Sequence, residues 1–191
     1  MNAASRQESE KGVPQSRRAL FPFRFDGATF DSRQVKPGML YVALKGERTD
    51  GHAFVEQALA AGAAGALVRA DWPCPAGVDE SRLMRVADTR LGFGELARTY
   101  RQTLKAKVVG ITGSAGKTTV KELAAAFLRA GGFKVHATAG NFNNDLGLPL
   151  TVLNCPTDAD FLVVEMGTNH PGEIAYLADI AAPEEIGRAH V

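Results

Sequence analysis

The segment between residues 107 and 130 constrains the fold of this chain more than any other. An apolar stretch, Lys107–Thr112, runs directly into GSAGKTT, and a helical pattern follows over Lys117–Ala130. Gly113 and Gly116 allow the loop to turn its backbone N–H groups toward an anion, and the start of the following helix carries a partial positive charge. This strand–loop–helix order predicts an α/β domain that binds phosphate.

The loop residues indicate a nucleoside triphosphate and Mg²⁺ as the ligands. In loops of this kind the lysine reaches the outer phosphates and the next hydroxyl binds the metal, which assigns these roles to Lys117 and Thr118. Ile111 occupies the first glycine position of the GxxxxGK[ST] pattern, so the loop fits the variant TGxxGKT[ST] instead. The competing interpretation is a structural glycine turn that happens to precede a lysine. The predicted cofactor-binding loop residues are Gly113, Ser114, Ala115, Gly116, Lys117, Thr118 and Thr119.

Strand-like and helix-like segments alternate along the rest of the chain. In the first half we expect strands at 39–44, 66–68 and 83–86 and helices at 52–61 and 89–104, the helices capped by Asp50 and by Asp88 or Thr89. In the second half we expect strands at 107–112, 134–137 and 161–165 and helices at 117–130, 146–153 and 171–180. Such alternation is typical of an α/β fold with a mostly parallel sheet covered on both faces.

We expect two domains that meet near Lys105. The first, at 19–105, is a small α/β domain that starts with strand-type phenylalanines (Phe21, Phe23, Phe25 and Phe30), and residues 1–18 before it are expected to be disordered. The second, at 106–185, contains only about three strands, so its sheet should have an unpaired edge. The last residues, IGRAHV at 186–191, read like a translated sequencing adapter, and we expect a non-native tail there.

Composition excludes several functional classes. The net charge of +1 offers no basic field for nucleic acid. Two cysteines, Cys74 and Cys155, do not make a disulfide framework and form no CxxC pair. The sequence has neither an apolar run of signal-peptide length near its start nor a stretch that could span a bilayer, so we expect a cytoplasmic protein.

Four blocks of sequence resemble one family, the Mur ligases of bacterial cell-wall precursor synthesis. TGSAGKTT at 112–119 is similar to the ATP loop of that family, and residues 31–54, DSRQVKPGMLYVALKGERTDGHAF, resemble a UDP-binding domain that two of its members share. GNFNNDLGLP at 140–149 and EMGTNHPGEI at 165–174 resemble the member that adds D-alanyl-D-alanine. The resemblance covers about residues 23–185.

In the second domain, Glu165 ends the hydrophobic run FLVVE, where a carboxylate beside a phosphate loop can hold Mg²⁺. The resemblance implies the same role, so Lys117 and Glu165 are the predicted catalytic residues, and Thr118 and Glu165 the predicted metal ligands. It also suggests that the glycine-flanked asparagine loop lies beside the nucleotide, with Asn141 and Asn144 as contacts. A purely structural turn is the alternative for both asparagines.

The remaining predicted contacts are to the acceptor substrate. In the first domain, two polar loops contain Ser32 and Arg33, and Lys45 and His52; the resemblance implies that they hold the UDP part of the substrate. His170 is a candidate neighbour of the substrate or of phosphate. For each of these residues the competing interpretation is ordinary structural or surface chemistry.

The resemblance implies an ATP-dependent ligase. ATP would phosphorylate the terminal carboxylate of UDP-N-acetylmuramoyl-tripeptide, and the amine of D-alanyl-D-alanine would attack the acyl phosphate to give an amide, ADP and phosphate. The full-length enzyme is expected to be a monomer.

The sequence also departs from the family. The family has a third domain that closes over ATP, and a metal-binding histidine and a carbamylated lysine later in the central domain. None of these is in the 191 residues, so we expect this polypeptide alone to be inactive as a ligase. Alternatives are the related tripeptide synthetase, a folylpolyglutamate-type ligase and a non-catalytic nucleotide-binding remnant.

Overall fold

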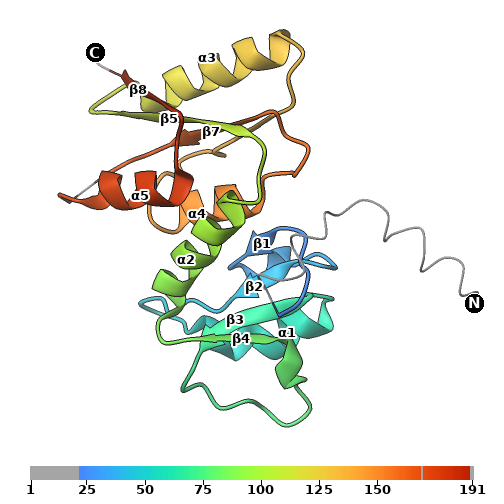
Figure 1. Ribbon diagram of the computed structural model, residues 1–191. Coiled ribbons are helices and arrows are strands. Elements are labelled where there is room, and N and C mark those ends of the chain that lie inside the picture. The colour runs from blue at the N-terminus through green and yellow to red at the C-terminus, as the bar shows by residue number, and fades with distance from the viewer. Residues whose placement is uncertain (1–21, 169, 190–191) are drawn as a thin grey trace, which may run out of the picture.

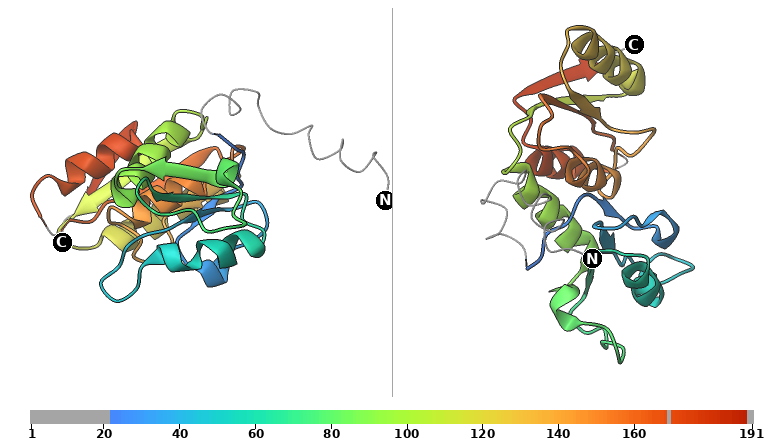
Figure 2. Two further views of the ribbon diagram at one scale, coloured as in Figure 1. Left: turned by 90° about the horizontal axis from the view of Figure 1, so that it is seen from below. Right: turned by 90° about the vertical axis from the view of Figure 1, so that its right-hand side faces the viewer.

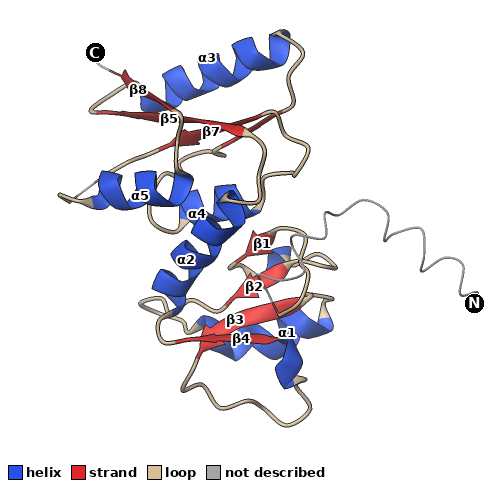
Figure 3. Ribbon diagram, viewed as in Figure 1, coloured by secondary structure: helices blue, strands red, loops and turns tan. Residues whose placement is uncertain are grey.

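The computed structural model describes residues 22–168 and 170–189, which form two parallel sheets with helices packed against them (Figure 1 and Figure 3). The strand order is β1-β2-β3-β4 in the first sheet and β6-β7-β5-β8 in the second. Every strand pair in both sheets is parallel. This confirms the predicted α/β class. Within these residues, no helix combines the length and hydrophobicity needed to cross a bilayer.

The first sheet carries its helical segments in the connections between strands. Its elements are β1 (Ala28–Thr29), β2 (Leu40–Val42), α1 (Val55–Ala60), β3 (Gly65–Arg69) and β4 (Leu83–Val86), with 3-10 turns at Ser32–Gln34, Gly51–Phe54 and Glu80–Arg82. Asp50 caps the second of these turns, as predicted, because its side chain accepts a hydrogen bond from the His52 N–H. The helix predicted from residue 52 therefore begins as a 3-10 turn.

The predicted strand of phenylalanines is wrong for the described residues, because only Ala28 and Thr29 pair with β2. Phe25 lies outside any strand and is buried in the hydrophobic core, and Phe23 packs against the same core. Alternating aromatic residues can bury themselves from an irregular segment as well as from a strand. Phe21 and the segment 1–18 lie outside the described residues.

The second sheet has helices on both faces. Its elements are β5 (Lys107–Gly113), α3 (Lys117–Ala130), β6 (Val135–Ala137), α4 (Gly147–Leu153), β7 (Phe161–Glu165), α5 (Glu173–Ala181) and β8 (Glu185–Ala189). Figure 1 shows α3 on one side of this sheet and α4 and α5 on the other. Because β7 pairs directly with β5, Ile111 lies opposite Glu165. This register brings Glu165 next to the phosphate loop that follows β5.

The three strands expected at 106–185 are β5, β6 and β7, and a fourth, β8, which was not predicted, pairs with the free side of β5. Gly113 lies opposite Ala189 and has a φ of +145°, and a Cβ atom there would lie 2.1 Å from the Ala189 carbonyl oxygen. Glycine is therefore required at the end of β5 in this arrangement. β8 includes residues 186–189 of the segment that we expect to be non-native, and the origin of that segment stays a prediction.

Helix α2 (Thr89–Arg101) packs against both sheet regions. It contacts β3 of the first sheet and both α4 and α5 beside the second, and Figure 2 shows it between the two halves of the molecule. At Gly94 a Cβ atom would lie 2.1 Å from the Tyr176 hydroxyl, so α2 and α5 approach each other closely. The predicted domain boundary near Lys105 thus follows α2, a helix that packs against both halves of the molecule. The domain limits themselves stay a prediction.

Hydrogen bonds add to the contact between the two halves. Asn154, at the end of α4, accepts a bond from the Ala28 N–H at 3.1 Å and donates to the Ala28 carbonyl at 3.0 Å. The Tyr100 hydroxyl on α2 donates to the Cys155 carbonyl at 3.2 Å. These bonds attach β1 and α2 of the first half to the C-terminal end of α4.

Candidate functional site

The phosphate loop joins β5 to α3. Gly116 takes a left-handed conformation with φ of +74° immediately before the helix, which suits glycine. The Lys117 ammonium donates to the Gly113 carbonyl at 2.9 Å, so this side chain lies back across the loop. Ser114, Ala115 and Thr119 are exposed. The predicted loop residues therefore lie at the carboxyl end of β5, where several of them are open to solvent.

Glu165 and Thr118, the two predicted metal ligands, are in direct contact. Glu165 is the last residue of β7, and only 2% of its surface is exposed. One carboxylate oxygen accepts a bond from the Thr118 hydroxyl at 2.8 Å, and the other accepts from the Asn143 amide at 2.8 Å. The sequence predicted Thr118 and Glu165 as metal ligands, a role that stays a prediction, and it gave Asn143 no role in the site.

The charge at Glu165 suits a cation. Its hydrogen-bond donors are neutral, and no described residue forms an ion pair with it. A buried carboxylate is costly unless a positive charge balances it. The described residues contain no group of three or more His, Cys, Asp or Glu that could hold a metal by themselves. Mg²⁺ often binds through one or two protein oxygens together with phosphate oxygens and water, so Thr118 and Glu165 fit that ion.

The asparagine loop places its three amides differently. Asn143 reaches Glu165, and a Cβ atom at Gly167 would lie 2.8 Å from the Asn143 amide carbon, so the two segments pack closely. The Asn144 side chain accepts bonds from the N–H groups of Leu146 and Gly147, at 3.2 and 2.8 Å, and so caps the start of α4. Asn141 is exposed. The structure thus supports the turn interpretation for Asn144, and the nucleotide contacts of Asn141 and Asn144 stay predictions.

A cavity of about 390 Å³ adjoins Lys117 and the asparagine loop. Its wall includes exposed His170, whose backbone N–H donates to the Glu173 carboxylate at 3.1 Å. Arg90 enters the same wall from the start of α2 and pairs with Asp145. No sequence pattern pointed to Arg90, because its place depends on how α2 packs. The neighbouring residue Asn169 lies outside the described residues.

A larger cavity, of about 670 Å³, lies in the first domain. It brings together the predicted residues Ser32 and Arg33 with aromatic side chains, a combination that suits a nucleobase and phosphate. Arg33 donates two hydrogen bonds to Asp31, at 2.9 and 2.8 Å, and these bonds lower the pKa of Asp31 to about 2. The lining residues are Phe30, Asp31, Ser32, Arg33, Tyr41, Leu44, Gly46, Thr49, Gly51, Phe54 and Gln57.

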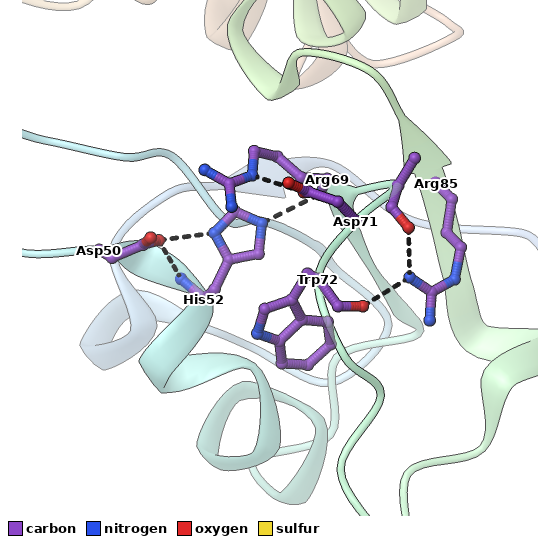
Figure 4. A network of polar contacts seen from close by, with 7 residues as sticks. Asp50, His52, Arg69, Asp71, Trp72 and Arg85 are labelled. Carbon is purple, nitrogen blue, oxygen red and sulfur yellow. Dashed lines mark hydrogen bonds and ion pairs between the residues drawn. The ribbon is translucent and has the colours of Figure 1, made fainter.

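His52 does not line this cavity. Its ring is buried, with Nδ1 at 2.6 Å from an Asp50 carboxylate oxygen and Nε2 accepting from the Arg69 N–H at 2.9 Å (Figure 4). The backbone donor fixes the tautomer, because Nε2 must carry the lone pair and Nδ1 the proton. With both ring nitrogens occupied, His52 has a structural position, and the predicted substrate contact is not supported by the geometry.

Lys45 also lies apart from Ser32 and Arg33. It is exposed and lines a separate cavity of about 270 Å³ together with Arg69 and Arg90. Of the four residues predicted to hold the UDP group, the structure therefore brings together only Ser32 and Arg33.

Comparison with known proteins gives matches in both halves of the chain. Residues 24–101 match the model of the Mur ligase family catalytic domain, and residues 111–191 match the Mur ligase middle domain. The UDP-N-acetylmuramoyl-tripeptide–D-alanyl-D-alanine ligase of Escherichia coli K12 is 49% identical over 159 residues, which are 83% of this chain and 34% of that protein. The Bacillus subtilis 168 ligase of the same name is 42% identical over 170 residues, which cover 86% and 36%.

Solved structures of such ligases are also similar to this chain. The corresponding ligase of Acinetobacter baumannii has a TM-score of 0.74 at 39% identity, covering 86% of this chain and 36% of that one. The MurF ligase of Thermotoga maritima, solved in complex with ADP, has a TM-score of 0.69 at 37% identity, covering 82% and 35%. The chain spans about a third of the length of the curated relatives it matches. The matches to both domains, and to ligases of one name, show that this chain belongs to the Mur ligase family.

Proposed function

We propose that this chain supplies the UDP-substrate-binding and ATP-binding parts of a ligase that adds D-alanyl-D-alanine to UDP-N-acetylmuramoyl-tripeptide. The observation that carries the proposal is the contact between Thr118 and the buried Glu165 beside a glycine loop that ends in Lys117. The names of the relatives support the choice of substrates. They favour this ligase over the tripeptide synthetase.

The second domain would bind ATP and Mg²⁺. Lys117 now donates to a loop carbonyl and can exchange that bond for phosphate oxygens. Thr118 and Glu165 would hold Mg²⁺, which when bound neutralises negative charge on the phosphates. The role of the loop N–H groups is to stabilise charge that develops as the phosphoryl group moves.

In the proposed reaction, the terminal carboxylate of the tripeptide takes the outer phosphoryl group of ATP, which gives an acyl phosphate and ADP. The amine of D-alanyl-D-alanine then attacks, and the tetrahedral adduct collapses to the amide with release of phosphate. The cavity at Ser32 and Arg33 would hold the UDP group. Binding at both sites brings two polyanions together, so positioning and charge neutralisation are the main tasks of the residues described above. Because the proposed substrates are ATP and a UDP-linked precursor, we propose that the reaction takes place in the cytoplasm.

Titration calorimetry with ADP in the presence of Mg²⁺ tests nucleotide binding by the 191-residue chain. We expect binding, and we expect Lys117→Ala to weaken it by about 10- to 100-fold, since a hydrogen bond to a charged group contributes about 1.5–3 kcal/mol. Lys134→Ala is the matched control, because Lys134 is exposed and its ammonium pairs with Asp158 at 2.7 Å. Failure of the folded wild-type chain to bind ADP would overturn the proposal.

A phosphate-release assay with ATP, UDP-N-acetylmuramoyl-tripeptide and D-alanyl-D-alanine tests the reaction. The complete ligase is expected to release phosphate only when both the tripeptide substrate and D-alanyl-D-alanine are present. The 191-residue chain is expected to release none. Turnover by the short chain would contradict its expected inactivity. Nucleotide binding without turnover by the complete protein would favour a non-catalytic nucleotide-binding protein.

A further inference from the structure

We propose that Lys121 and Thr138 form a positioning pair that fixes the phosphate loop relative to Glu165, and that this pair controls Mg²⁺-dependent nucleotide binding without touching the nucleotide. The inference rests on the proposed binding of a nucleotide and Mg²⁺ at Thr118 and Glu165. It concerns two residues that the mechanism above does not use.

Lys121 is buried completely, which is unusual for a lysine. Its ammonium donates to the Thr138 carbonyl at 2.7 Å and pairs with a Glu122 carboxylate oxygen at 2.8 Å. Glu122 is exposed, so the buried end of this arrangement is the bond to Thr138. Lys121 therefore attaches α3 to the segment that follows β6.

Thr138 in turn is bound to β7. Its backbone N–H donates to the Val163 carbonyl at 3.0 Å, and its hydroxyl accepts from the Glu165 N–H at 3.0 Å. Thr138 is itself 1% exposed. The backbone of Glu165 is therefore linked to α3 through Thr138 and Lys121.

The two links from α3 to Glu165 start one helical turn apart. Thr118 donates to the Glu165 carboxylate, and Lys121, three residues later on the same helix, reaches the Glu165 backbone through Thr138. Residues three apart on a helix point to the same side. The link from Thr118 holds the carboxylate of Glu165, and the link from Lys121 holds its main chain. Together they set the separation between the Thr118 hydroxyl and the carboxylate, on which a shared Mg²⁺ ion depends.

Packing alone does not account for a lysine at this position. An apolar side chain of similar length would fill the same space without the cost of removing an ammonium from water. The buried charge instead provides a directed bond to one carbonyl, which an apolar residue cannot make. This directed bond is the feature that the proposal assigns to positioning.

The test compares ADP affinity with and without Mg²⁺ by titration calorimetry on the 191-residue chain. For Lys121→Met we expect the gain in affinity that Mg²⁺ gives the wild type to fall at least tenfold, while the affinity measured in EDTA changes less than twofold. Arg129→Met is the matched control, because Arg129 on the same helix also donates to a backbone carbonyl, that of Val135 in β6. Glu122→Gln should likewise keep the wild-type response, since the bond from Lys121 to Thr138 remains.

A second pair of variants separates positioning from folding. Thr138→Val keeps the shape but removes the acceptor for the Glu165 N–H, and Thr138→Ser restores it. We expect Thr138→Val to lose the Mg²⁺-dependent gain and Thr138→Ser to recover most of it, with circular dichroism showing both to be folded. Wild-type Mg²⁺ dependence in folded Lys121→Met or Thr138→Val would overturn this inference alone. Absence of any Mg²⁺ effect in the wild type would instead overturn the proposed metal site.

Discussion

Polar side chains in the two regions find their partners in different ways. Around the first sheet they bond to close neighbours: Arg33 forms an ion pair with Asp31, and the neutral His52 ring hydrogen-bonds to Asp50. Beside the second sheet, the buried carboxylate of Glu165 has only neutral donors, and the Lys117 ammonium donates to a carbonyl.

This difference separates structural polar groups from groups arranged for a ligand. A buried polar group whose partners are all internal stabilises the local fold and has little left for a ligand. A buried carboxylate without a cation is unfavourable in the isolated protein, and an added cation relieves that cost. We therefore expect changes at the buried His52 to alter stability and changes at Glu165 to alter ligand binding.

Replacing His52 should produce the largest effect on stability. His52→Ala removes a buried ring and leaves the Arg69 N–H without its acceptor, so we expect a loss of about 3 kcal/mol in the free energy of unfolding. Urea unfolding followed by circular dichroism measures this loss, with exposed Glu56→Ala as the control. A loss below about 1 kcal/mol would mean that the ring is not the internal support described above.

Asn154 tests whether the two regions unfold together. Asn154→Ala removes both bonds to Ala28, and we expect a loss of about 2 kcal/mol, with the unfolding transition becoming broader as the two halves uncouple. Calorimetric unfolding is the measurement, and Gln102→Ala, exposed at the end of α2, is the control. If Asn154→Ala unfolds in one sharp transition at the wild-type temperature, these bonds do not couple the halves.

Glu165 should show the opposite behaviour to His52. Glu165→Gln removes the buried charge while keeping the size of the side chain. We expect it to lower the Mg²⁺-dependent gain in ADP affinity at least tenfold, about 1.4 kcal/mol, while the free energy of unfolding changes by less than about 1 kcal/mol. Calorimetry with and without EDTA measures the first quantity. An unchanged response to Mg²⁺ would exclude Glu165 as the metal ligand.

The smallest effect is expected at Asp31. Hydrogen bonds from Arg33 lower its pKa to about 2 from an ordinary value of 3.8. A carboxyl with a lowered pKa in the folded state contributes stability that is complete above about pH 4 and is lost as the pH falls through about 2. Arg33→Gln should move the pKa of Asp31 back toward 3.8 and weaken this pH dependence, which an NMR titration of the carboxyl carbon can follow. An unmoved pKa would show that other donors hold it down. Since Arg33 is 84% exposed, the effect on stability should be slight.

The local pattern of the sequence predicted most of the helices and strands and the position of the phosphate loop, but it missed β8 and wrongly predicted a strand of phenylalanines. The apolar run before Gly113, the glycines of the loop and the helical pattern after Lys117 are contiguous, so they predicted the phosphate loop without knowledge of the packing. The position of Glu165 beside the loop could be predicted because it ends a strand, and parallel strands place such residues at one edge; its role as a metal ligand stays a prediction. The caps at Asp50 and Asp88 could also be predicted, because each side chain bonds to backbone N–H groups within three residues along the chain.

Tertiary structure decided which side chains meet. The two adjacent asparagines are equivalent in the sequence, yet Asn143 reaches Glu165 while Asn144 caps α4, because the turn directs them apart. His52 was predicted to contact the substrate, but its ring is buried and accepts a hydrogen bond from the Arg69 N–H. This contact could not be predicted, because Arg69 lies on a strand 17 residues further along the chain. The link from Lys121 through Thr138 to Glu165 likewise joins three separate elements. Sequence patterns record short-range periodicity and capping, whereas contacts between distant segments depend on strand order and packing, which no local pattern specifies.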